Sequence, residues 1–425
     1  MRQKIWFLLF LTILLAGCGR GEEMAAITPT AVIPPSPSAT AAAAASPRPT
    51  ASRTPVPPAT ATATPTLTLT PAFPLYTGRP LAREKLGVQV HLREQDQAEI
   101  FRQLQELGVG WVKVQISWKL YEPYPGEYHA ARFAELDRFV DTAVSQNINV
   151  LLSVSKAPEW SRPTTEMDGP PGDFGLYRQF MQYAASRYQG KVAAYELWNE
   201  ANLQREWNGF PLGGALFVDL LREGAAGARV GDANALLISG APAVTGINDR
   251  AAAIDDRQFL QEMLGAGLTR VVDGVGAHPY GFANPPDSSY ENPDTAVPSH
   301  NNHPSFFFRD TMADYHVLIG GELPIWATEF GWGSFDGLTN EAGTPQPPLP
   351  GTEYMNDVSE WQQAEYTLRA FEMGQEWEWA GPMFLWNLNF GPLLGTDFSE
   401  TGYSLLRPDG AARPLYHTLK NAAKE

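Results

Sequence analysis

Cysteine is almost absent from this chain: Cys18 is the only one in 425 residues, so no disulfide can form within the chain. Basic residues are also few, since 31 Lys and Arg stand against 47 Asp and Glu and give a formal net charge of -16. Because binding to a nucleic-acid backbone needs a basic face, we expect no nucleic-acid partner. The content of hydrophobic residues, 44%, is sufficient for a large core and excludes a disordered protein.

The apolar run at the start, from Ile5 to Leu15, is too short to span a bilayer comfortably, and it follows basic residues as in a secretory signal. It ends in Leu15-Ala16-Gly17-Cys18, which resembles the lipobox of bacterial lipoproteins and implies cleavage before Cys18 and lipidation of that residue. An ordinary signal peptide with a chance cysteine is the alternative. We predict a lipoprotein signal peptide over residues 1–17 and a mature protein anchored to a membrane on its extracytoplasmic face, at the cell surface or in the periplasm.

Residues 27–71 are almost only Ala, Thr, Pro and Ser and show no periodic apolar face, so they cannot bury a core. Proline favours an extended chain of roughly 3.1 Å per residue, which predicts a stalk on the order of 100 Å long. We therefore predict a lipid-anchored, disordered linker over residues 18–78 and a folded domain over residues 79–425, with the lipid anchor as its only membrane contact.

In the folded domain, short β-rich runs alternate with longer stretches of helical period, which is typical of parallel βα units. Eight units can be counted, and they predict a (β/α)8 TIM barrel. Six strands are expected at 86–90, 111–118, 148–154, 235–239, 272–277 and 382–387, and two more begin at Ala194 and Pro324. The clearest helices are expected near 97–107, 177–188, 212–228, 256–264, 306–318, 360–376 and 414–423. A doubly wound open sheet is the alternative, but the turn after the first strand lacks its Gly-rich phosphate loop.

Polar and aromatic residues follow the predicted strands, as expected of a barrel whose active site lies at the carboxyl ends of its strands. Two strands end in a carboxylate: Trp198-Asn199-Glu200 closes the fourth, and Glu329 lies at the end of the seventh. The other strand ends carry His91, Trp118, Trp160, His278, Tyr280, Trp332 and Trp386.

A pair of carboxyl groups is what hydrolysis of a glycosidic bond requires, one to protonate the leaving oxygen and one to attack or to activate water. Each glutamate alone could be a solvated strand end, but together they predict a catalytic pair. At close spacing two like charges disfavour double ionisation, so one of the two is expected to be protonated near neutral pH. The four tryptophans could stack on the flat faces of sugars or belong to the core, and His278 could be a structural histidine.

These motifs resemble clan A of the glycoside hydrolases, the retaining (β/α)8 enzymes, in branches like family 39 or family 5. The resemblance implies that Glu200 is the acid/base, that Glu329 is the nucleophile, and that Asn199 binds the sugar hydroxyl beside the reacting carbon. It further implies that His278 or Tyr280 contacts the nucleophile and that Trp386 floors the adjacent subsite. The turn from Trp118 through Glu122-Pro123 to Tyr128 is also similar to the clan's second loop.

Two positions depart from the clan's pattern. Ala201 follows the acid/base where many members have proline, and Lys113 stands where many carry an arginine that supports the nucleophile. Lysine supplies the charge but not the two-pronged geometry of a guanidinium. Among the remaining acidic residues, Glu196 is expected to be a buried or inter-strand partner, and Glu122 and Glu127 to be turn residues.

Taken together, the sequence predicts an exported retaining glycoside hydrolase that acts on a poly- or oligosaccharide and needs no metal or other cofactor. A metal-dependent barrel hydrolase is a weaker alternative, because it would want clustered ligands such as His-x-His at the first strand end, where His91 stands alone. A surface carbohydrate-binding protein that kept the barrel but lost the chemistry is the non-enzymatic alternative. The sugar, the linkage, the choice between chain ends and interiors, and the oligomeric state are not indicated by the sequence.

Overall fold

The computed structural model describes residues 76–425. The predicted signal peptide, the lipidation site at Cys18 and nearly all of the predicted linker lie outside the described residues. Within the described part, no helix is long and apolar enough to cross a membrane.

Eight parallel strands pair in sequence order, and the eighth closes on the first to form a barrel. The TIM-barrel prediction is confirmed, and the open sheet is excluded. The strands are β1 (Leu86–Val90), β2 (Trp111–Ser117), β3 (Asn149–Ser155), β4 (Ala194–Leu197), β5 (Leu236–Ser239), β6 (Gly274–Ala277), β7 (Ile325–Phe330) and β8 (Ala380–Leu385).

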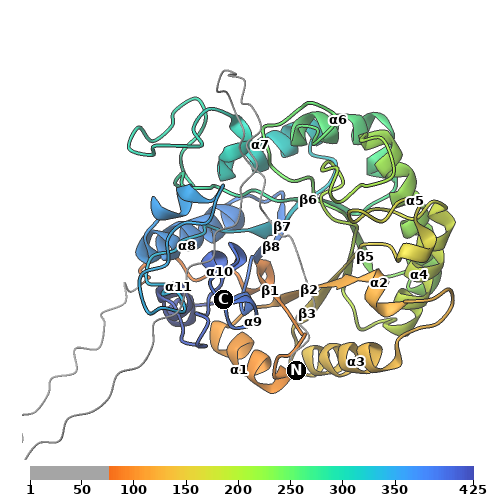
Figure 1. The fold of residues 1–425 in the computed structure, drawn as a ribbon, viewed down its shortest axis with the longest axis horizontal. Helices are drawn as coiled ribbons and strands as arrows, with labels where there is room; N and C mark the ends of the chain where they lie inside the picture. The colour runs from red at the N-terminus through yellow and green to blue at the C-terminus, as the bar shows by residue number, and fades with distance from the viewer. Residues whose placement is uncertain (1–75) are drawn as a thin grey trace, which may run out of the picture. The chain divides into compact units, whose positions relative to one another are not determined.

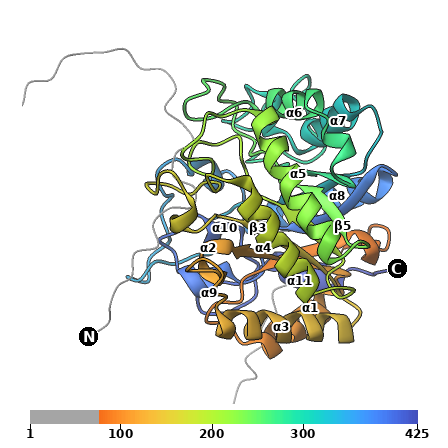
Figure 2. The same cartoon turned by 90° about the vertical axis from the view of Figure 1, so that its right-hand side faces the viewer.

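Helices surround the strands on the outside of the barrel (Figure 1). The long ones are α1 (Gln97–Leu107), α3 (Ala130–Ser145), α4 (Phe174–Arg187), α5 (Gly214–Gly231), α6 (Asp256–Gly265), α7 (Phe308–Ile319), α8 (Glu360–Glu376) and α11 (Pro414–Asn421). Helices α4 and α5 pack side by side along the wall seen in Figure 2. The predicted helices agree with these to within a few residues. Three short helices were not predicted: α2 (Trp118–Tyr121), α9 (Phe390–Leu394) and α10 (Glu400–Tyr403), in the segments that follow β2 and β8.

The barrel has two apolar regions because alternate residues of each strand face opposite sides. Six strands contribute one residue each to a small cluster, which contains Trp111, Leu151, Ala194, Ile238, Trp326 and Phe384. The rings of Trp111 and Trp326 meet edge to face at 5.2 Å between centroids. Glycine makes room for these rings, since a Cβ on Gly87 would lie 2.7 Å from the ring of Phe384. This layer fills the barrel below the strand ends that carry the polar residues.

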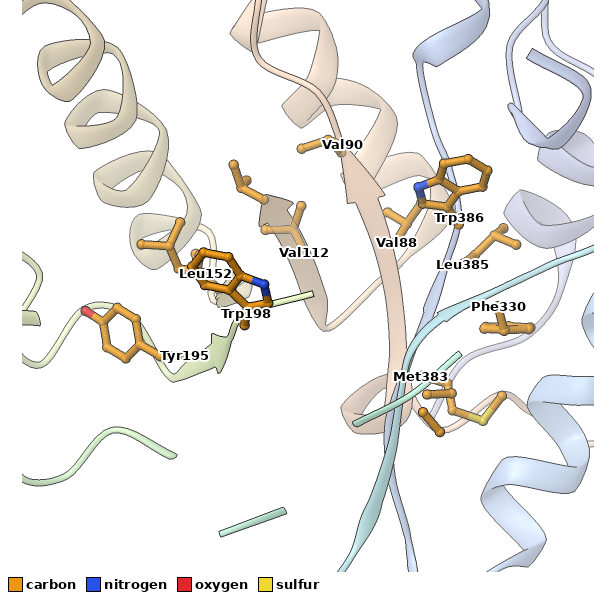
Figure 3. Close-up of a cluster of buried hydrophobic side chains, with 14 of the residues drawn as sticks. Val88, Val90, Val112, Leu152, Tyr195, Trp198, Phe330, Met383, Leu385 and Trp386 are labelled. Carbon is orange, nitrogen blue, oxygen red and sulfur yellow. The ribbon is translucent and has the colours of Figure 1, made fainter. Parts of the chain in front are cut away.

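The larger apolar cluster joins the other face of the strands to the helices. It contains strand residues such as Val88, Val112 and Leu152 together with Leu104 of α1 and Phe139 of α3. Figure 3 shows part of this cluster, with Trp198 and Trp386 among its members. The predicted site residue Trp386 and the ring of Trp198, which comes before Glu200, thus belong to the core.

Candidate active site

The carboxyl ends of strands β4, β6 and β7 and the interior of β2 contribute to one group of charged side chains. Five residues predicted for the site are brought together there by direct contacts, and they are Lys113, Glu200, His278, Tyr280 and Glu329.

Glu200 is held by an unusual turn after β4. Trp198 and Glu200 have φ angles of 77° and 43°, in the left-handed region that bulky residues rarely adopt. The ring of Trp198 is fully buried against Tyr177 and Trp207, and the backbone N–H of Glu200 donates to the carbonyl of Ala241 at 2.9 Å. The packing of Trp198 therefore maintains a strained backbone that directs Glu200 toward His278, and such strain is common at functional sites.

The Glu200 carboxylate has a side-chain nitrogen beside each oxygen. Its Oε1 lies 3.0 Å from Nδ1 of His278, and its Oε2 accepts a hydrogen bond of 3.2 Å from Arg205. Burial raises the pKa of Glu200, but the hydrogen bond and charge of His278 and the charge of Arg205 outweigh burial and lower this pKa to about 2. Glu200 is thus ionised at neutral pH, which differs from the expectation for a proton donor.

Glu329 is almost completely buried and has two hydrogen-bond donors. The hydroxyl of Tyr280 donates to Oε2 at 3.1 Å, and the ammonium of Lys113 donates to Oε1 at 3.1 Å. Burial and the neighbouring charge of Glu329 raise the pKa of Tyr280 well above its usual value, so this hydroxyl keeps its proton as a donor. The predicted contact between Lys113 and the second glutamate is present.

Lys113 lies between two carboxylates inside the barrel. Its Nζ is 2.8 Å from Oε2 of Glu196 and 3.1 Å from Oε1 of Glu329, and it also donates to the carbonyl of Thr328. Burial lowers the pKa of Lys113, but the charges of Glu196 and Glu329 outweigh burial and raise it. Glu196 is the buried inter-strand partner that the sequence predicted, and it reaches across the barrel from β4 to β2.

His278 bridges the two predicted catalytic carboxylates. Its Nδ1 lies 3.0 Å from Glu200 and 3.9 Å from Oε2 of Glu329. Burial lowers the pKa of His278, whereas the charges of Glu329 and Glu200 raise it by more. The other ring nitrogen, Nε2, is buried without a hydrogen-bond partner. A structural histidine would have both nitrogens satisfied, so this geometry favours a role in the site.

Asn199 and Trp386 lie beside these charges. The Oδ1 atom of Asn199 is buried and has no hydrogen-bond partner, an arrangement that costs free energy unless a ligand supplies a donor. The ring of Trp386 meets the ring of Tyr280 edge to face at 6.0 Å between centroids. Tyr280 in turn donates a hydrogen bond to Glu329, so Tyr280 connects Trp386 to the carboxylate pair.

His91 is engaged with the segment after β8. Its backbone exchanges two hydrogen bonds of 2.9 Å with the side chain of Asn389, and its ring meets Phe390 edge to face. Burial lowers the pKa of His91 to about 4, so the imidazole is neutral at pH 7. Its contacts fasten the first strand end to the β8 segment and do not reach either glutamate.

Two of the predicted sugar-stacking tryptophans belong to the core instead. Trp118 is 0% exposed, lies against Phe180 and donates its ring N–H to Glu122 at 2.7 Å. Trp332 is 1% exposed and donates its ring N–H to the carbonyl of Asn284. A ring covered by protein on both faces has none left for a sugar. The substrate-contact prediction for these two residues is therefore wrong.

Trp160 is partly exposed on the segment after β3. Its ring stands edge to face on Trp118, and its N–H donates to the carbonyl of Glu122 at 3.1 Å. Glu122 also accepts hydrogen bonds from Trp118 and from the backbone of Gly126, which is the behaviour expected of a turn residue. Trp160 has no contact with the carboxylate pair among the interactions that the structure shows for the described residues.

The sequence reasoning missed Arg205, which follows Glu200 by five residues and binds its Oε2. Its position in the same loop was the only available signal. In the described part of the chain, no group of three or more His, Cys, Asp or Glu side chains could hold a metal ion. A separate hollow of about 360 Å³ lies in the β7–α8 segment, lined by residues such as Phe335, Leu338 and Gln362, and no predicted site residue lines it.

One protein-family model matches part of the chain. Residues 90–193 match the family model Glyco_hydro_42, described as beta-galactosidase. A comparison of the sequence with curated proteins finds no match.

Solved structures show the same fold. A family 39 glycoside hydrolase from the gut symbiont Bacteroides cellulosilyticus WH2 is 22% identical, with a TM-score of 0.59 over 81% of this chain and 64% of the other. A glucosidase from Croceicoccus marinus is 14% identical, with a TM-score of 0.54 over 81% and 68%. The exo-beta-1,4-mannosidase Op5Man5 from Opitutaceae bacterium strain TAV5 is 16% identical, with a TM-score of 0.53 over 80% and 59%. The chain thus spans less than two thirds of the first and third of these proteins. It is similar to a glycoside hydrolase family model over residues 90–193, and its barrel is similar to glycoside hydrolase barrels over about four fifths of its length.

Proposed function

We propose that this protein is a retaining O-glycoside hydrolase that acts on a poly- or oligosaccharide with Glu200 as acid/base and Glu329 as nucleophile. The observation that carries the proposal is the shared contact of both carboxylates with Nδ1 of His278, at 3.0 Å and 3.9 Å. The match of residues 90–193 to a glycoside hydrolase family model supports the same reaction class.

The spacing of the carboxylates favours retention. Because one atom of His278 contacts both, the nearest oxygens of Glu200 and Glu329 lie at most about 7 Å apart. Retaining enzymes hold the two groups about 5 to 5.5 Å apart, whereas inverting enzymes need about 6.5 to 9.5 Å to admit a water. This upper limit for the nearest oxygens is compatible with the retaining separation.

The reaction then proceeds in two steps. The carboxylate of Glu329, oriented by Lys113 and Tyr280, attacks the anomeric carbon while Glu200 gives a proton to the departing oxygen, which breaks the glycosidic bond. Glu200 next takes a proton from water, whose oxygen releases the sugar from Glu329. The unsatisfied Oδ1 of Asn199 accepts a hydrogen bond from a sugar hydroxyl, and the small exposed part of Trp386, 6% of the residue, provides an apolar contact.

The proposal names a bond class and no particular sugar. The similar proteins are described as a beta-galactosidase, an exo-beta-1,4-mannosidase and a glucosidase, which act on different sugars.

A panel of aryl glycosides tests the function directly. We expect the wild-type chain to hydrolyse at least one member, and Glu329→Ala and Glu200→Ala to abolish or strongly reduce that turnover. Glu127→Ala, at an exposed turn, is the control and should leave turnover unchanged. Unchanged turnover in either active-site variant would disprove the assignment of that residue.

The alternative is a carbohydrate-binding protein without catalysis. It predicts that a sugar protects the protein against unfolding while no glycoside on the panel is cleaved. The alternative is weakened by the presence of both glutamates and of a donor set around Glu329, which a pure binding protein does not require.

We also propose that the protein is exported and anchored through a lipid on Cys18, with residues 18–78 as the linker to the barrel. The sequence around Cys18 supports this proposal. Fractionation of bacterial cells expressing the full chain should find the wild type in the membrane fraction and Cys18→Ala outside it. Recovery of the wild type and of Cys18→Ala in the same soluble fraction would contradict the lipid anchor.

A further inference from the structure

Both oxygens of the Glu200 carboxylate are occupied, Oε1 by His278 at 3.0 Å and Oε2 by Arg205 at 3.2 Å. A general acid must bring its proton within about 3 Å of the atom that receives it. Each oxygen keeps a second lone pair, but a donor held against it disfavours protonation, so release of one partner favours transfer of a proton from Glu200 to a leaving oxygen.

The two partners differ in their freedom to move. The side chain of His278 is 0% exposed, and its ring stands edge to face against Tyr280. The side chain of Arg205 is 29% exposed, lies on the loop after β4 and binds Glu200 through one hydrogen bond. Displacing Arg205 breaks a single partly solvated contact, whereas displacing His278 would require the core to repack.

Arg205 also lies in the field of two other carboxyl groups. Burial raises the pKa of Glu206 to about 6 and that of Glu400 to about 7, and the charge of Arg205 opposes the rise in both. The Oε2 atom of Glu206 is buried without a hydrogen-bond partner. A guanidinium that leaves Glu200 thus still interacts with these two carboxyl groups, of which Glu206 also has the ammonium of Lys156 at 3.9 Å.

We propose that Arg205 is a displaceable clamp on Glu200: together with His278 it favours the ionised carboxylate, and a bound sugar displaces Arg205 and frees Oε2 for proton transfer. This inference rests on the proposed function. When Arg205 leaves, Glu200 takes up one proton from solvent, and that proton passes to the departing oxygen as the glycosidic bond breaks. Arg205 is a positioning residue.

Charged and titratable groups approach Glu200 from three parts of the barrel. His278 and Tyr280 come from the segment after β6, Glu329 from β7, and Arg205 and Glu206 from the loop that carries Glu200 itself. Of the two side chains that bind Glu200, Arg205 is the one that a substitution can remove without disturbing the buried residues around His278.

Titration of the free protein tests the clamp without any substrate. In the full chain labelled with 13C at glutamate carboxyl groups, Glu200→Gln identifies the Glu200 signal. We expect Arg205→Gln to raise the pKa of Glu200 by about one unit and Arg205→Lys to preserve it. Arg250→Gln, which breaks a surface pair with Glu262, is the matched control and should leave Glu200 unchanged. An unchanged Glu200 titration in Arg205→Gln overturns the proposal.

Kinetics on an aryl glycoside that the wild type cleaves then test the displacement. The pH profile of kcat/KM reports the free enzyme, and that of kcat reports the complex. Glu200 must be protonated to act as the acid, so its pKa sets the alkaline limb of each profile. Arg205→Gln should therefore shift the alkaline limb of kcat/KM to higher pH by about one unit and leave the alkaline limb of kcat unchanged. Equal shifts in both limbs would overturn displacement, since Arg205 would still face Glu200 in the complex. If the wild type cleaves no glycoside, the proposed function fails, and the titration still decides whether Arg205 clamps Glu200.

Discussion

Lys113 and Glu196 form an ion pair inside the barrel, with 2.8 Å between Nζ and Oε2 and no exposed surface on either side chain. Glu329 shares the same ammonium at 3.1 Å, so one positive charge lies between two carboxylates. Removing one member of a buried pair leaves an uncompensated charge, which is far more costly than the net value of the pair itself.

Lys113→Met should therefore destabilise the fold strongly. We expect a loss of about 3 to 5 kcal/mol in the free energy of unfolding, measured by urea titration at pH 7. The double variant Lys113→Met/Glu196→Gln should recover part of that loss, because the orphaned charge on Glu196 is gone. Arg250→Gln, at an exposed pair, should cost less than about 1 kcal/mol. A small effect of Lys113→Met would contradict the buried pair.

The hydroxyl of Tyr280 supports the proposed nucleophile and should be needed for catalysis more than for folding. Tyr280→Phe removes a hydrogen bond to a charged acceptor, and such a bond is worth about 1.5 to 3 kcal/mol. We expect kcat/KM on an aryl glycoside to fall about 10- to 100-fold. The matched control is Tyr315→Phe, because the Tyr315 hydroxyl also binds a buried carboxylate, that of Asp256. Tyr315→Phe should lower stability and leave kcat/KM unchanged, and an equal kinetic loss in both variants would argue against a specific role for Tyr280.

The positions of the strand ends could be predicted because each is marked by two local patterns in the sequence. The first is an apolar run, which a barrel buries on both faces, and the second is a polar residue directly after it. These two signals suffice to assign Glu200 and Glu329 to the ends of different strands of one barrel. They also identify Glu196 as a buried partner, since residues two or four apart on a strand share a face.

Contacts made beyond the strand ends could not be predicted in the same way. Beyond the end of a strand, the alternation of residues no longer indicates where a side chain points. Trp118 and Trp386 therefore look equivalent in the sequence. In the structure, Trp118 packs against Phe180 of α4, whereas Trp386 contacts Tyr280. The short helices α2, α9 and α10 span too few residues for a helical period to be visible. The left-handed turn at Trp198 depends on tertiary packing, and the clamp by Arg205 depends on where that turn directs Glu200.

Trp118 and Trp386 should accordingly respond differently to truncation. Trp118→Ala should cost about 3 to 5 kcal/mol of unfolding free energy because it empties a packed site, with KM unchanged at temperatures where the variant is folded. Trp386→Ala should raise KM about fivefold, since a lost aromatic contact is worth about 1 kcal/mol. Thermal unfolding and Michaelis kinetics on the same preparations separate the two effects. A raised KM in folded Trp118→Ala would indicate that Trp118 contacts the substrate after all.

The depressed pKa of Glu200 predicts how the stability of the barrel depends on pH. The pKa is about 2 in the folded protein against an ordinary 4.5, so the ionised carboxylate stabilises the fold fully above pH 4.5 and loses this contribution as the pH falls toward 2. The difference corresponds to about 3 kcal/mol at neutral pH. Glu200→Gln, which has no titratable group, should be less stable than the wild type by about this amount at pH 7. The gap between the two should narrow steadily from pH 4.5 to pH 3, when both are followed by urea unfolding in one buffer series. A gap that stays constant over this range would show that Glu200 is not held ionised by His278 and Arg205.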